Sequence, residues 1–90
     1  MSHDNWRFEI EAMVDPHSRV RVLGYFAQRS VVPDALEMRV GDGRMTIRLI
    51  VNDLPGAQAH IVAAKLEQIV LVCSVRLDQL QVTERQQAAA

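Results

Sequence analysis

Residues 14–20, with the sequence VDPHSRV, place an aspartate, a histidine and a serine within four consecutive positions. These are the residue types of a hydrolase triad, in which Ser18 would be the nucleophile, His17 the general base and Asp15 the group that orients the base. The spacing argues against this chemistry, because a nucleophile must hydrogen-bond to its base and neighbouring residues on a helix's first turn point in divergent directions. The function of this segment therefore depends on the elements that surround it.

Length and composition indicate one small globular domain. The chain has 90 residues, of which 49% are hydrophobic and 23% are charged, enough for a single core without disulfides or metals. The net charge of −1 leaves no basic excess to neutralise phosphates, so nucleic acid is not an expected partner. The single cysteine, Cys73, lies in an apolar run, and we expect it to pack as a small hydrophobe in a reducing compartment. The first residues have no apolar stretch of the signal-peptide or anchor type, which predicts a cytoplasmic protein without a membrane partner.

Hydrophobic periodicity predicts four strands and two helices. Alternation of apolar and polar side chains, or a short apolar run, predicts strands at residues 6–14, 33–40, 44–51 and 70–77. Apolar residues at helical spacing predict helices at residues 18–29 and 57–68. Asn52 or Asp53 is expected to cap the second helix, with Pro55 in its first turn.

The dipeptide Asp42-Gly43 is a tight hairpin signature and fixes how the second and third strands pair. With these two residues as the loop, the expected buried pairs are Val40 with Met45, Met38 with Ile47 and Leu36 with Leu49. The same register places Glu37 opposite Arg48 on the other face, a charge pair of about 0.2–1 kcal/mol.

The order of elements is strand, helix, strand, strand, helix, strand. Right-handed crossovers turn this order into an α+β, ferredoxin-like βαββαβ sandwich, a four-stranded antiparallel sheet with both helices on one face. We expect the domain to cover residues 6–77 and residues 78–90 to form a poorly ordered tail. This fold hosts many unrelated functions, so function must be decided from the side chains.

Several activities of ferredoxin-like domains can be tested against the residues present. An RNA binder needs aromatic side chains on the open sheet face, where the first strand offers Arg7, Glu9 and Glu11 instead. A soft-metal carrier needs paired cysteines in the first loop, and Cys73 is far along the chain. An acylphosphatase-like hydrolase needs a phosphate-cradling loop with an arginine. Arg19 is a weak match to such an arginine, and this alternative stays open.

Three segments resemble the ACT domain and, within that family, the small regulatory subunit of acetolactate synthase. The helix RVLGYFAQRS at residues 21–30 is similar to the family's Arg-Val-apolar-x-apolar-apolar-x-x-Arg-Gly helix. The strand RMTIRLIV at residues 44–51 adds to the likeness, and KLEQIVLVCSV at residues 65–75 is similar to the family's Leu-x-x-Leu-apolar-x-Val entry into the last strand. The likeness covers residues 8–77.

The resemblance implies an effector site and a dimer interface. ACT domains receive an amino-acid effector at the turn between the first strand and first helix, where a helix amino terminus offers amides and a positive dipole end to a carboxylate. The implied effector contacts are Asp15, Pro16, His17, Ser18 and Arg19, with His17 in place of the family's glycine. Edge-to-edge pairing of second strands would form a homodimer. The implied interface residues are Val31, Val32, Pro33 and Leu36.

The resemblance also implies a function. The chain would be a non-catalytic regulatory subunit without a cofactor of its own, which binds and activates the large subunit of acetolactate synthase and senses a branched-chain amino acid. A stand-alone ACT amino-acid sensor is the alternative, and a small acylphosphatase-like hydrolase is the third.

Overall fold

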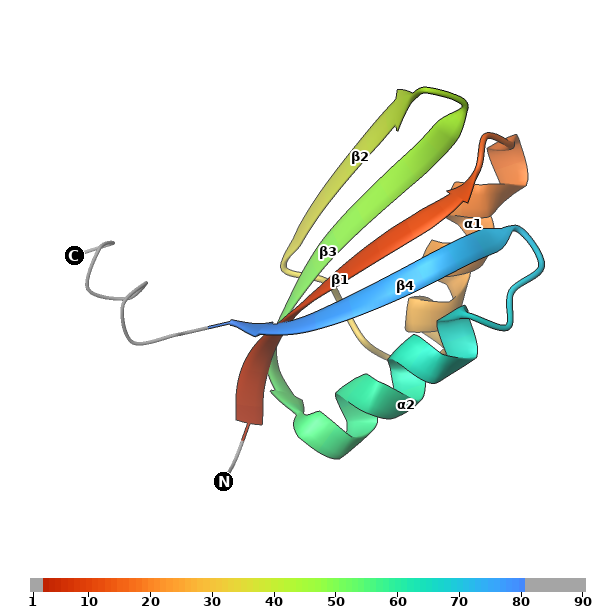
Figure 1. Cartoon of the computed structure of the whole chain (residues 1–90). Coiled ribbons are helices and arrows are strands. Elements are labelled where there is room, and N and C mark those ends of the chain that lie inside the picture. Colours follow the sequence, from red (N-terminus) through yellow and green to blue (C-terminus); the bar gives the residue numbers. More distant parts are fainter. Residues whose placement is uncertain (1–2, 81–90) are drawn as a thin grey trace.

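The computed structural model describes residues 3–80 as one four-stranded antiparallel sheet with two helices on one face (Figure 1). The elements are β1 (His3–Met13), α1 (Pro16–Gln28), β2 (Ala35–Gly41), β3 (Arg44–Pro55), α2 (Gly56–Leu66) and β4 (Val72–Leu80). The strand order is β2-β3-β1-β4. The predicted ferredoxin-like βαββαβ fold is confirmed, and residues 81–90 of the expected tail lie outside the described residues.

The core lies between the two central strands and the helices. Alternate residues of β1 and β3 point toward the helices, which contribute apolar side chains at helical spacing. Phe8 of β1 and Phe26 of α1 are both buried, and their rings meet edge to face with centroids 5.3 Å apart. The other fully buried apolar side chains of large volume are Ile10, Ile47, Leu49, Leu66, Val22 and Val62.

The hairpin register is confirmed in full. Val40 pairs with Met45, Met38 with Ile47, and Leu36 with Leu49. Asp42 and Gly43 have φ values of 51° and 73°, the two positive values that a type I′ turn requires.

The predicted burial of the β2 side chains is wrong. Their partners on β3 are buried, but Leu36 is 49% exposed and Val40 is 59% exposed, while Met38 is half-buried. The reason is that β2 is an edge strand, and the core lies over the central pair β1 and β3. The second strand therefore presents apolar side chains to its surroundings.

Several element boundaries differ from the prediction. Strand β1 begins at His3, and β3 continues to Pro55 through a register shift between Asp4 and Trp6. The predicted cap of α2 is wrong, because Asn52 and Asp53 lie within β3, and the residue at the N-cap is Pro55, which makes no side-chain cap bond. Strand β4 runs to Leu80, three residues into the expected tail, because it continues to pair with β1 as far as Asn5.

Helix α1 ends at a residue with left-handed backbone geometry. Ser30 has a φ of 60°, its amide donates to the Ala27 carbonyl at 3.0 Å, and the Val31 amide donates to the Phe26 carbonyl at 2.9 Å. This is the hydrogen-bond pattern of a Schellman cap, a position that glycine normally occupies because it has no Cβ to strain.

We therefore expect Ser30→Gly to raise the free energy of unfolding by about 1 kcal/mol, since it removes the strain of a side chain at positive φ. Urea unfolding followed by circular dichroism measures the change. Ser74→Gly, the same substitution in strand β4, is the matched control and is expected to destabilise. A loss of stability in Ser30→Gly would contradict the left-handed geometry.

Candidate functional site

The turn between β1 and α1 is closed by its own hydrogen bonds. Asp15 is the N-cap of α1, and its Oδ1 accepts the His17 amide at 2.8 Å. The Ser18 amide donates to the Asp15 carbonyl at 3.0 Å, and Pro16 has no amide hydrogen. The amides of His17 and Ser18, which were expected to meet an effector carboxylate, therefore already have acceptors in the Asp15 side chain and carbonyl. The same occupied amides leave no phosphate-cradling loop of the acylphosphatase kind.

Aspartate, histidine and serine do not form a triad. Asp15 Oδ1 does contact His17 Nδ1 at 3.0 Å, although side chains at these positions were expected to diverge. Ser18 points elsewhere: it is buried, and its hydroxyl donates to the Met13 carbonyl at 2.7 Å, which ties the end of β1 to the helix. Ser18 is thus a structural residue, and its hydroxyl proton is not available to an effector.

A hollow of about 270 Å³ lies between this turn and the β2–β3 hairpin. Its lining residues are Val14, Asp15, Pro16, Arg19, Met38 and Met45. Three of the five predicted effector contacts, Asp15, Pro16 and Arg19, therefore line one hollow. His17 lies outside it and lines a second hollow with the segment that connects α2 to β4.

Sequence reasoning missed the apolar wall of this hollow. Val14, Met38 and Met45 line it beside the charged residues. Met45 reaches this turn because it pairs with Ala12 at the end of β1, a register that the sequence did not specify. That pairing follows from the order of strands in the sheet and not from the turn sequence.

Of the two charged side chains in the hollow, Asp15 is hydrogen-bonded within the chain and Arg19 is not ion-paired among the described residues. The pKa of the Asp15 carboxyl lies below its ordinary value of 3.8, first because the His17 backbone amide donates to it and then because the His17 side chain does. Asp15 is thus ionised at neutral pH. Among residues 3–80, Arg19 is exposed and has no ion-pair partner. The hollow therefore offers one carboxylate, one unpaired guanidinium and an apolar wall.

Acid is expected to destabilise the fold through two aspartates. The pKa of Asp78 is also lowered, by hydrogen bonds from Arg76 and then Arg7. Because both carboxyls bind protons more weakly in the folded chain, their stabilisation is complete above the ordinary value of 3.8 and is lost as the pH falls through the lower folded values. Melting temperatures measured from pH 6 down to pH 2 should fall, with a shallower fall in Asp78→Asn. Equal slopes in both proteins would contradict this assignment.

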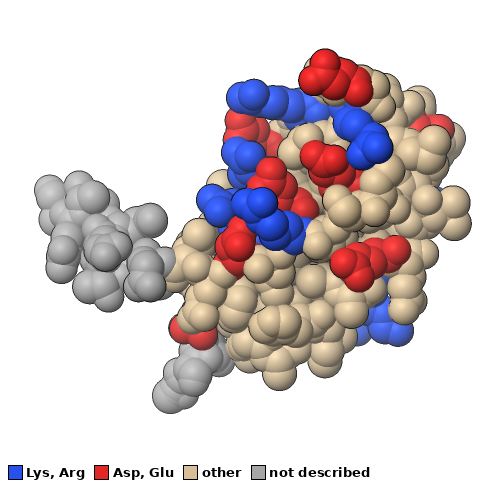
Figure 2. Space-filling model, viewed as in Figure 1, with Lys and Arg blue, Asp and Glu red and all other residues tan. Residues whose placement is uncertain are grey.

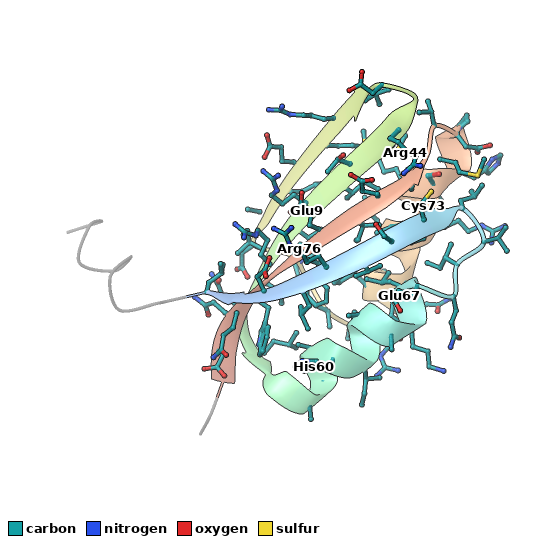
Figure 3. The ribbon with its side chains drawn as sticks, in the orientation of Figure 1. Glu9, Arg44, His60, Glu67, Cys73 and Arg76 are labelled. Atoms are coloured by element: carbon teal, nitrogen blue, oxygen red, sulfur yellow. The ribbon has the colours of Figure 1, made fainter. Side chains whose placement is uncertain are left out.

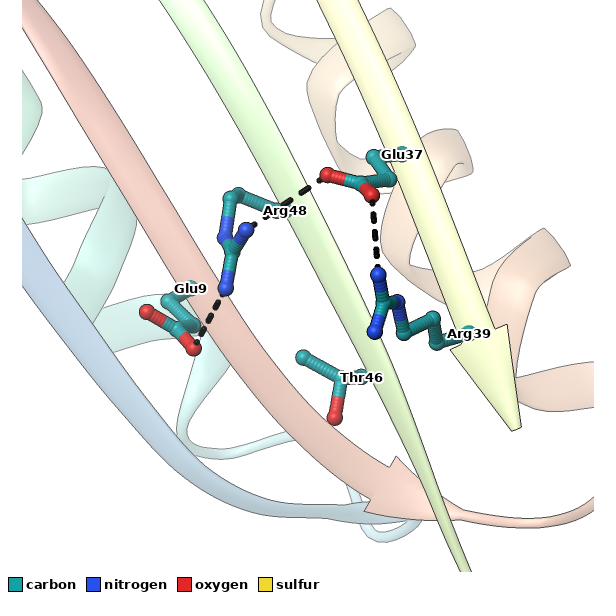
Figure 4. A pocket seen from close by; sticks show the side chains of 5 residues that line it. All are labelled: Glu9, Glu37, Arg39, Thr46 and Arg48. Carbon is teal, nitrogen blue, oxygen red and sulfur yellow. Dashed lines mark hydrogen bonds and ion pairs between the residues drawn. The ribbon is translucent and has the colours of Figure 1, made fainter. Parts of the chain in front are cut away.

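The open sheet face carries charges that are paired across the strands (Figure 2). Arg48 of β3 contacts Glu9 of β1 at 3.2 Å and Glu37 of β2 at 3.4 Å, at the edge of a shallow hollow of about 240 Å³ (Figure 4). Arg44 contacts Glu11 at 3.3 Å, and Figure 3 shows Glu9, Arg44 and Arg76 on this face. The predicted Glu37–Arg48 pair is confirmed. The side chains that line this hollow are all polar, so they offer no surface on which bases could stack.

Cys73 is exposed, and the prediction that it packs as a core residue is wrong. The register of β1 with β4 shifts between Glu11, which pairs with Ser74, and Ala12, which pairs with Val72. Cys73 is the extra residue of this irregularity, and it lies at the end of β4 that follows α2 (Figure 3).

Within residues 3–80, no three histidine, cysteine, aspartate or glutamate side chains are grouped to hold a metal ion. In the same range, no helix has the length and apolarity to span a membrane.

Comparison with known proteins identifies the family. A family model described as an ACT-like domain matches residues 2–84. The ACT domain from GTP pyrophosphokinase of Chlorobium tepidum has a similar structure, with a TM-score of 0.74 and 13% identity over 86% of this chain and 100% of that one. An ACT domain protein from Streptococcus pneumoniae has a TM-score of 0.70 and 14% identity over 92% of this chain and 97% of that one.

The ligand-free regulatory subunit of aspartate kinase from Thermus thermophilus is also similar, with a TM-score of 0.67 and 16% identity over 86% of this chain and 52% of that one. At these identities the structures establish the fold. A search of curated proteins found no match. Since the family model extends over all of the described residues, the chain belongs to the family of ACT-like domains.

Proposed function

We propose that this chain is a non-catalytic regulatory module whose hollow at the β1–α1 turn binds an amino acid with an apolar side chain. The observation that carries the proposal is the presence of Asp15, Arg19 and an apolar wall in one hollow. A free amino acid is a zwitterion with one carboxylate and one ammonium group. The hollow contains one charge of each opposite sign.

The side chains suggest how the ligand would be oriented. Arg19 would take the ligand carboxylate, since its guanidinium suits that group and has no other ion pair among the described residues. The Asp15 carboxylate would take the ammonium group. Met38 and Met45 would contact the apolar side chain, and their flexible thioethers adapt to branched shapes. Valine, leucine and isoleucine are therefore the proposed effectors.

Calorimetric titration of the full chain with each of these three amino acids tests the proposal. Heat of binding is expected for at least one of them and not for lysine or glutamate, whose side chains would place a charge against the methionines. An absence of heat for valine, leucine and isoleucine would contradict effector binding.

We further propose that the chain forms a homodimer by pairing β2 strands edge to edge. Among the described residues, the outer edge of β2 pairs with no other strand, and such an edge is a template for another strand. Leu36 of β2 is 49% exposed, and Val32, three residues before β2 begins, is 81% exposed. Val31 and Pro33 are half-buried, so they would contribute less to the interface. Met38 lies on β2 and also lines the hollow at the β1–α1 turn, here called the effector hollow. Because it belongs to both, it would couple dimerisation to amino-acid binding.

The double variant Leu36→Lys, Val40→Lys is expected to convert the dimer to a monomer, because it places like charges along the proposed seam. Light scattering after gel filtration should give twice the 10.1 kDa chain mass for the unaltered protein and the single mass for the variant. Ile61→Lys alters an exposed apolar residue of α2 and is the control. A monomeric unaltered protein, or a dimeric double variant, would contradict this interface.

The proposed partner is the large subunit of acetolactate synthase, which the module would bind and activate. The support is the resemblance of residues 21–30 and 65–75 to the small subunit of that enzyme. Purified large subunit should gain activity when the chain is added. A chain that binds amino acids but neither binds nor activates the large subunit would instead be a stand-alone ACT sensor.

A further inference from the structure

A groove runs along α1 on the side that faces the connection between α2 and β4. It consists of two hollows of about 340 and 390 Å³ that share Arg21. The residues that matter for its chemistry are Val20, Arg21, Gly24 and Tyr25 of α1 with Ile69 and Val70 of the connection. Asp15 and His17 also line the groove at the start of α1, where the Asp15 carboxylate already accepts from the amide of His17 and contacts its ring. The effector hollow lies toward the β2–β3 hairpin and shares only Asp15 with the groove.

The groove is apolar and open. Val20 is 60% exposed and Val70 is 86% exposed, and both line it. Tyr25 forms part of the wall, and its hydroxyl is buried without a hydrogen-bond partner among the described residues. Apolar side chains gathered in a concave surface are typical of a site that another molecule covers.

Packing within the described residues does not explain why a glycine stands at position 24, inside helix α1. A glycine inside a helix costs about 1 kcal/mol relative to alanine. A Cβ added at Gly24 would meet no atom within 4 Å, so no neighbouring element requires the missing side chain. Its effect is to deepen the groove, which lets another segment approach the helix backbone closely.

The charge around the groove selects its occupant. Helix α1 contains Arg19 and Arg21 and no acidic residue, and among residues 3–80 neither arginine has an ion-pair partner. Arg29, just after the helix, lies over the Tyr25 ring at 5.8 Å. The arginines of the open sheet face differ, because each contacts a carboxylate. They are Arg7, Arg39, Arg44, Arg48 and Arg76.

We propose that this groove docks an acidic segment of a partner protein, with apolar side chains against Gly24, Ile69 and Val70 and carboxylates at Arg21. A second copy of α1 in the groove would oppose arginine to arginine and is disfavoured. This inference does not depend on effector binding.

The test uses the full chain and a fluorescent helical peptide of about 15 residues, with leucines on one face and glutamates flanking them. Anisotropy should show saturable binding that weakens about tenfold when salt is raised from 50 to 500 mM, because the carboxylate–arginine contacts are screened. Amide resonances of Gly24 and Val70 should shift on binding. A control peptide with every glutamate changed to lysine should not bind.

Two variants separate docking from folding. Gly24→Gln should melt at or above the temperature of the unaltered chain yet bind the peptide at least tenfold more weakly, because the new side chain fills the groove. Arg21→Glu should weaken binding as much, whereas Lys65→Glu, the same change of charge on α2 outside the groove, should not.

Three results would overturn the proposal. The first is an absence of peptide binding at 1 mM. The second is equal binding of the lysine peptide. The third is binding that Gly24→Gln and Arg21→Glu leave unchanged. Binding to anionic vesicles of phosphatidylserine is measured as well. If the chain binds vesicles through α1 but does not bind the peptide, the arginines would contact a lipid surface instead of a protein.

Discussion

Replacing Phe8 with alanine is expected to lower the free energy of unfolding by about 3–5 kcal/mol, a large part of the roughly 5–15 kcal/mol that stabilises a small domain. Phe8 lies on the central strand β1, is fully buried and meets Phe26 of α1 edge to face. Its loss would leave a cavity where the sheet and α1 pack together, and close packing on both sides limits how far that cavity can collapse. Urea unfolding followed by circular dichroism measures the change.

The control for this variant is Val32→Ala, which truncates a side chain that is exposed in the single chain. The control is measured in the monomeric Leu36→Lys, Val40→Lys background, where Val32 is not covered by a second copy. There it should change the free energy of unfolding by no more than about 0.5 kcal/mol. A loss below about 1 kcal/mol in Phe8→Ala would contradict the placement of this ring in the core.

Replacing Arg19 with alanine is expected to weaken amino-acid binding at least tenfold, about 1.4 kcal/mol or more, because the ligand carboxylate loses its charged donor. Arg19 is exposed and unpaired among the described residues, so its removal should leave the fold intact. Calorimetry with the tightest of valine, leucine and isoleucine measures the effect. Arg39→Ala removes an exposed arginine from the open sheet face and should bind as the unaltered chain does.

Asp15→Asn tests the other end of the ligand. Asparagine caps a helix about as well as aspartate, so the fold should persist while the charge that faces the ammonium group is removed. Binding should weaken in this variant too. Full affinity in both Arg19→Ala and Asp15→Asn would mean that the hollow does not hold the zwitterion.

The fold could be predicted because several local signals agree. Alternation in β1 and β3, helical spacing in α1 and the Asp42-Gly43 turn all specify the same arrangement, and the turn fixes the hairpin register. Alternation cannot show whether a strand lies at the centre or the edge of a sheet, and so the burial of Leu36 and Val40 was overestimated. The exposure of Cys73 was missed for a related reason, since a register shift in β4 has no signature in the sequence.

The turn of the proposed effector site was singled out from the sequence, but the contacts its side chains make could not be predicted. The sequence grouped Asp15 and Arg19 at one turn, and both line one hollow. The sequence could not show that Asp15 would occupy the helix amides or that Ser18 would turn inward to the Met13 carbonyl, since both depend on the path of the turn. Met38 and Met45 entered the hollow through tertiary packing, for which periodicity gives only the face of the strand.

The most direct test of amino-acid binding in this hollow is a methyl NMR titration of the full chain labelled at its methionines. The methyl signals of Met38 and Met45, which line the hollow, should shift in a saturable way with leucine, valine or isoleucine. The same titration of Arg19→Ala should show the shifts only at much higher ligand concentration. Methyl signals of Met38 and Met45 that do not respond to any of the three amino acids would contradict the proposed function.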